Sequence, residues 1–67
     1  MFNSTIKEVG PLEMMVIINN RTPLGKFYRY HTALDKHVAC DNSAGDAWVK
    51  EFETRHEAIE WLMGADR

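Results

Sequence analysis

The sequence predicts a single small α+β domain, with an antiparallel sheet of three to four strands in a meander and one C-terminal helix packed on one face. Two features lead to this prediction. Short apolar and aromatic runs alternate with turn residues over positions 12–53, and a capped amphipathic helix follows at 54–64. A chain of 67 residues has room for one hydrophobic core, so we expect one domain over 1–67.

Residues 1–11 are expected to form an N-terminal arm or an edge strand. Ile6 and Val9 are able to dock on the domain, but Gly10 and Pro11 break the segment. Residues 12–19 are predicted to be the first full strand, because they contain the consecutive β-branched residues at 16–18. This strand is apolar on both faces, which is typical of a central or doubly covered strand.

Three further strands are predicted at 26–34, 37–41 and 47–53, separated by turns. In the first of these stretches, 26–34, side chains alternate so that Tyr28 and Tyr30 share one face and Arg29 and His31 share the other. Short connections between successive strands favour neighbouring antiparallel pairs, which gives the meander over 12–53.

The C-terminal helix has signals at both ends. Thr54 and Glu57 form a capping-box pattern, and Gly64 fits the position where a helix ends in left-handed backbone. Apolar residues recur at helical spacing between them, at Ala58, Ile59, Leu62 and Met63. One helix covers one face of a sheet, so we expect the other face to meet a further surface.

No pattern in the sequence predicts catalysis or metal binding. The spacing of His37 and Cys40 would place them on opposite faces of a strand, and zinc sites use tighter pairs. Cys40 lies in an apolar strand, where a free cysteine is ordinarily buried and unreactive. The turn at 41–46 fails the calcium-loop pattern, because Gly45 and Asp46 stand in exchanged positions. We therefore expect no enzyme activity, no cofactor and no metal.

Nucleic-acid binding is the alternative function that the residue pattern allows. The stretch Trp48–Ile59 resembles the strand-to-helix joint of the plant AP2 domain and of the arm-binding domain of some phage integrases, in which a three-stranded sheet contacts DNA. The resemblance covers about a dozen residues. The arginine-rich strand of those families is replaced here by Tyr28-Arg29-Tyr30-His31, and the net charge of −2 with a pI near 5.8 disfavours nucleic acid.

Self-association is the favoured functional expectation. A 67-residue chain with one cysteine has no internal disulfide, and chains of this size are often stabilised by a partner. We expect a non-catalytic interaction module, a homodimer that binds another macromolecule through its sheet face or edge. Small domains of this kind are common in phages and mobile elements. The candidate binding residues combine basic and aromatic side chains: Lys26, Phe27, Tyr28, Arg29, Tyr30 and Trp48.

A cytoplasmic location is expected. The first residues lack the basic and apolar regions of a signal peptide, and the apolar run Met14–Ile18 is far shorter than a membrane span.

Overall fold

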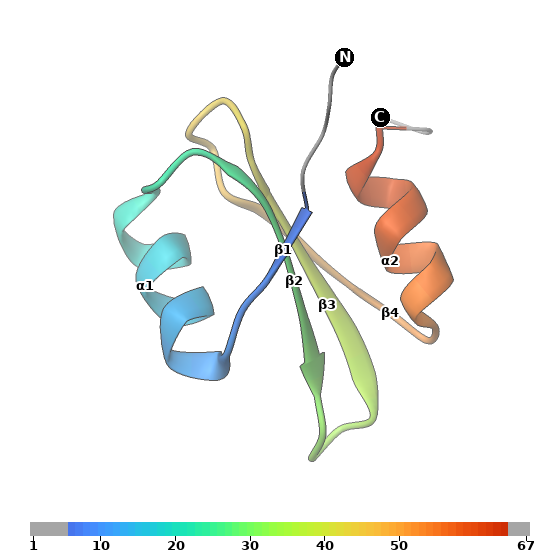
Figure 1. Ribbon diagram of the computed structural model, residues 1–67. Helices are drawn as coiled ribbons and strands as arrows, with labels where there is room; N and C mark the ends of the chain where they lie inside the picture. The colour runs from blue at the N-terminus through green and yellow to red at the C-terminus, as the bar shows by residue number, and fades with distance from the viewer. Residues whose placement is uncertain (1–5, 65–67) are drawn as a thin grey trace.

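A computed structural model describes residues 6–64. It is built from four strands and two helices (Figure 1). In chain order these elements are β1 (Ile6–Glu8), α1 (Pro11–Asn20), β2 (Gly25–His31), β3 (Lys36–Asn42), β4 (Trp48–Phe52) and α2 (Arg55–Leu62).

The strands form one mixed sheet in the order β1-β2-β3-β4. Strand β1 runs parallel to β2, whereas the β2–β3 and β3–β4 pairs are antiparallel. The predicted antiparallel meander is therefore confirmed for β2 to β4. The prediction of a purely antiparallel sheet was wrong, because α1 carries the chain from β1 back to the start of β2, which is the connection a parallel pair requires.

The predicted strand at 12–19 was wrong, since this segment is helix α1. Pro11 stands at the start of the helix, where its missing N–H and fixed φ are compatible with the first turn. Arg21 ends the helix in left-handed backbone with φ 59°, and its N–H donates to the carbonyl of Ile17. Met14 and Ile17, one turn apart, are its buried side chains.

The predicted C-terminal helix is confirmed as α2. The Glu57 N–H donates to Thr54 Oγ1 at 3.1 Å, which is the expected N-cap bond. Gly64 follows the helix with φ 83°, as its predicted role requires.

The two helices lie on opposite faces of the sheet, so the expectation of a single helix was also wrong (Figure 1). Side chains that alternate along β2 and β3 divide between two cores. The core under α1 contains Val9, Met14, Ile17, Phe27, Val38 and Cys40. The core under α2 contains Tyr28, Ala39, Ala58 and Leu62.

Asn42 ties the two loops at one end of the sheet together. Its side chain is fully buried, its Nδ2 donates to the carbonyl of Pro23 at 2.9 Å, and its Oδ1 accepts from the N–H of Ala47 at 3.1 Å. The segment before β2 and the turn before β4 are thereby held against the same side chain.

Candidate functional site

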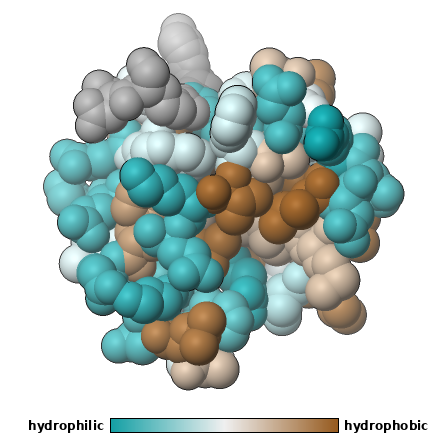
Figure 2. Space-filling model, turned by 180° about the vertical axis from the view of Figure 1, so that it is seen from behind, coloured by the Kyte–Doolittle hydropathy of each residue, from teal (hydrophilic) through white to brown (hydrophobic). Residues whose placement is uncertain are grey.

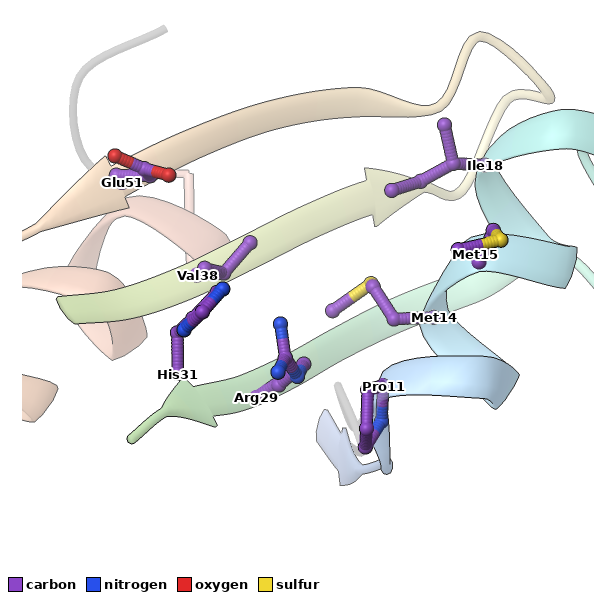
Figure 3. Close-up of a pocket in the computed structure, with 8 residues that line it drawn as sticks. All are labelled: Pro11, Met14, Met15, Ile18, Arg29, His31, Val38 and Glu51. Atoms are coloured by element: carbon purple, nitrogen blue, oxygen red, sulfur yellow. The ribbon is translucent and has the colours of Figure 1, made fainter. Parts of the chain in front are cut away.

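An open groove lies beside α1, on the face of the sheet that this helix covers only in part. We call it the α1 groove (Figure 3). Its volume is about 260 Å³. Residues from α1 and from β2, β3 and β4 line it: Pro11, Met14, Met15, Ile18, Arg29, His31, Val38 and Glu51.

The floor of the α1 groove follows from strand register. Val38 of β3 pairs with Arg29 of β2 on one side and with Glu51 of β4 on the other. Paired residues share a face, so a cation, an apolar side chain and an anion lie in one row across three strands. His31 is two residues beyond Arg29 and therefore shares its face.

Two nitrogen atoms in the α1 groove have no hydrogen-bond partner. These are Arg29 Nε and His31 Nδ1, and both atoms are buried. In Figure 3 the two side chains stand next to each other on β2, and both reach toward the space beside Met14 and Val38. Buried polar atoms without partners are uncommon in folded proteins, because each has lost its hydration.

A second exposed feature is the outer edge of the sheet at β4, which we call the β4 edge. Trp48 is 63% exposed and Val49 is 43% exposed, and their side chains lie on opposite faces.

Helix α1 also has exposed apolar side chains, since Met15 and Val16 are more than half exposed. Seen from behind, the surface has a band of apolar residues running from its centre to one side, with hydrophilic residues around it (Figure 2).

The predicted binding residues do not form one surface. Phe27 and Tyr28 are 4% and 3% exposed and belong to the two different cores. Arg29 lies in the α1 groove, while Tyr30 and Trp48 are exposed on the face that carries α2. The remaining residue, Lys26, is half-buried on that same face.

Polar groups on the α2 face are paired with one another. Tyr28 Oη lies 2.7 Å from His37 Nδ1, and Tyr30 Oη donates to Asp35 Oδ1 at 2.6 Å. Burial raises the pKa of Tyr28 above its usual value, and the nearby Arg55 opposes this shift. The guanidinium of Arg55 stands 5.3 Å from the centre of the Tyr28 ring. These contacts satisfy the polar groups of this face within the chain.

Cys40 is fully buried in the α1 core, and burial raises the pKa of its thiol. A thiol in this environment is a poor nucleophile. Over residues 6–64, no group of three His, Cys, Asp or Glu side chains is placed to hold a metal ion. No helix in that same range is long and apolar enough to cross a membrane.

Most of the α1 groove was not predicted from the sequence. The predicted common face of Arg29 and His31 is confirmed by the register. Met14, Met15 and Ile18 were not expected near them, because residues 12–19 were predicted to form a strand. The Gly10-Pro11 pair before an apolar run was the available signal for a helix start.

Comparison with protein-family models, with curated proteins and with solved structures found no match for this chain.

Proposed function

We propose that this chain is a non-catalytic interaction module that forms a homodimer by antiparallel pairing of the β4 edge with the same edge of a second copy. The observation that carries the proposal is the exposure of β4. Four of its five side chains are exposed, and the strand lies at the end of the sheet order. An open edge strand presents unpaired N–H and C=O groups that a second strand is able to satisfy.

The side chains of β4 favour one register. About a two-fold axis, an antiparallel pair has one residue opposite its own copy, and opposed residues share a face. Centring the pair on Lys50 or on Glu51 would oppose like charges, which is unfavourable. Centring it on Val49 opposes two apolar side chains and places Trp48 opposite the partner's Lys50, an arrangement suited to a cation–π contact.

The opposite edge of the sheet is a weaker candidate. Strand β1 has three residues, and two of them, Lys7 and Glu8, are exposed and charged. Short, charged strands are a common way of preventing edge pairing. The β4 edge is longer, and it carries Trp48 and Val49 as exposed apolar side chains.

Cysteine cross-linking tests this register directly. In the Val49→Cys variant the two new thiols would lie opposite each other, with Cα atoms about 4.5–5.5 Å apart, which suits a disulfide. We expect mild oxidation to produce a covalent dimer in high yield. This variant and its control are made in a Cys40→Ala background, because Cys40 is the cross-strand partner of Val49 and would pair with the new cysteine within one chain.

Glu51→Cys is the matched control, because it lies on the same strand and face as Val49. In the Val49-centred register the two cysteines of this variant would be offset by four residues, or about 13 Å along the strands, which is too far for a disulfide. Equal cross-linking of the two variants would overturn the register. A concentration-independent monomer mass for the unmodified protein up to about 1 mM would overturn the dimer, since mass action favours association at high concentration.

A further inference from the structure

We propose that the α1 groove binds the C-terminal residue of a partner protein, with a bulky apolar side chain and a free carboxylate. The groove is distinct from the β4 edge through which the homodimer is proposed to form. The proposal depends on three properties of the groove: a positively charged arginine, an apolar wall and an acidic group across the sheet.

Arg29 indicates the charge of the ligand. Arg29 Nε–H is a donor, and the Arg29 guanidinium is positively charged at any physiological pH. His31 Nδ1 lies in the same groove and is also without a partner. A carboxylate has two acceptor oxygens and makes strong, charge-assisted hydrogen bonds with arginine. Because Arg29 lines the groove, a bound carboxylate would pair with the positive charge of its guanidinium.

The apolar wall indicates what the carboxylate is attached to. Met14 and Met15 of α1 and Val38 of the floor contribute apolar surface within the same groove. Methionine side chains are flexible and polarizable, so they adapt to apolar groups of different shape. A volume of about 260 Å³ suits one large aliphatic side chain together with its own backbone.

Glu51 distinguishes a peptide terminus from a simple fatty or aromatic acid. It lies across Val38 from Arg29, on the opposite side of the row, and its side chain is exposed. A carboxylate there accepts hydrogen bonds, so it suits the amide N–H of a bound residue. A C-terminal residue has a carboxylate, an apolar side chain and an amide N–H on adjacent atoms, matching the three parts of the groove.

The test is an NMR titration of the isotope-labelled protein with N-acetyl-leucine, which carries all three groups. We expect saturable shifts of the Arg29 Nε–H signal and of the backbone signals of Met14 and Val38. N-acetyl-leucinamide has the same side chain without the charge, and we expect it to bind at least tenfold more weakly. Equal binding of the two compounds, or the lack of saturable shifts, would overturn the proposal.

Two variants assign the effect to Arg29. Arg29→Gln should weaken binding of N-acetyl-leucine at least tenfold, because it removes a charge-assisted hydrogen bond. Arg55→Gln makes the same change of charge on the α2 face and should leave binding unchanged. The backbone NMR spectrum of each variant reports whether it remains folded. An equal loss in both variants would show a general charge effect and contradict the site.

A third ligand and a third variant separate the remaining outcomes. N-acetyl-leucyl-aspartamide places its carboxylate on an internal side chain, and binding as tight as that of N-acetyl-leucine would refute recognition of a C-terminus. Val49→Lys would place like charges opposite each other in the proposed dimer, yet should bind N-acetyl-leucine normally. Arg29→Gln should still dimerise. These variants therefore distinguish a loss of ligand binding in the α1 groove from a loss of dimerisation through the β4 edge.

Discussion

Asn42 is predicted to be the polar residue on which the stability of the domain depends most strongly. The perturbation is Asn42→Ala, which removes both side-chain hydrogen bonds, to the Pro23 carbonyl and from the Ala47 N–H. A hydrogen bond of this kind contributes about 1 kcal/mol net, so the two together contribute about 2 kcal/mol. A domain of this size has a total stability of about 3–5 kcal/mol, so the loss is a large share of it.

Urea unfolding followed by tryptophan fluorescence measures this loss. With a slope of about 1 kcal/mol per molar urea for a small protein, the midpoint should fall by about 2 M. Asn19→Ala is the control, since Asn19 is exposed on α1 and should change the free energy of unfolding by less than about 0.5 kcal/mol. A loss below about 0.5 kcal/mol for Asn42→Ala would show that these two hydrogen bonds contribute little to the stability of the domain.

Asn42→Asp tests the two hydrogen bonds separately. The variant keeps an acceptor for the Ala47 N–H, but an ionised carboxylate has no donor for the Pro23 carbonyl. Burial disfavours the charge and raises the folded-state pKa above the unfolded value of about 3.9. The protonated acid restores a donor. The stability deficit of the variant relative to the unmodified protein should therefore be smallest near pH 4 and should grow as the pH rises through the folded-state pKa. A pH-independent difference between the two proteins would contradict this assignment.

Three further predictions concern single side chains. Thr54→Ala removes the N-cap bond of α2 and should lower the free energy of unfolding by about 1 kcal/mol, whereas a Thr54→Ser variant should retain most of it in the same urea assay. Cys40 is buried with a raised pKa, so a thiol reagent should modify it only as the protein unfolds, and faster in Asn42→Ala; rapid modification of the native protein would exclude this. Burial raises the pKa of Tyr28, so its contribution to stability is complete below the unfolded value of about 10 and is lost as the pH rises through the folded value. Tyr28→Phe should therefore lose less stability above pH 10 than the unmodified protein, as measured by thermal unfolding.

Local signals predicted the C-terminal half of the fold well. The N-cap at Thr54 and the stop at Gly64 depend on the backbone needs of the residues themselves, and both are confirmed. The strands β2 to β4 were found from alternating side chains and the turn residues between them, with ends that differ by one to three residues from the prediction. Strand ends depend on pairing with neighbours, which sequence alone does not specify.

The N-terminal half shows where this reasoning fails. The run Met14–Ile18 is apolar at every position, so its periodicity does not distinguish a strand from a partly buried helix. The segment packs as a helix. Of its residues only Met14 and Ile17, one turn apart, are buried, while Met15 and Val16 are exposed. The α1 groove depends on this helix, so it could not be predicted once the segment had been assigned to a strand.

Part of the candidate site was predictable from the sequence. The common face of Arg29 and His31 follows from the two-residue period of β2, and it was correct. Phe27 and Tyr28 were selected as aromatic residues near basic ones, but both fill cores. An aromatic residue in a strand is as suitable for a core as for a binding surface, and its neighbours on the other elements determine which role it has.

The division of the interior by the sheet has a consequence for how the sequence is able to change. Phe27 and Tyr28 are neighbours in the chain, yet they pack under different helices, as do Ala39 and Cys40. Substitutions at well-separated sites with no shared contacts have additive effects on stability. A substitution at Met14, under α1, is therefore compensated most directly under α1, while the packing of Leu62 beneath α2 stays as it is. The packing on one side of the sheet is therefore able to change while the other side stays constant.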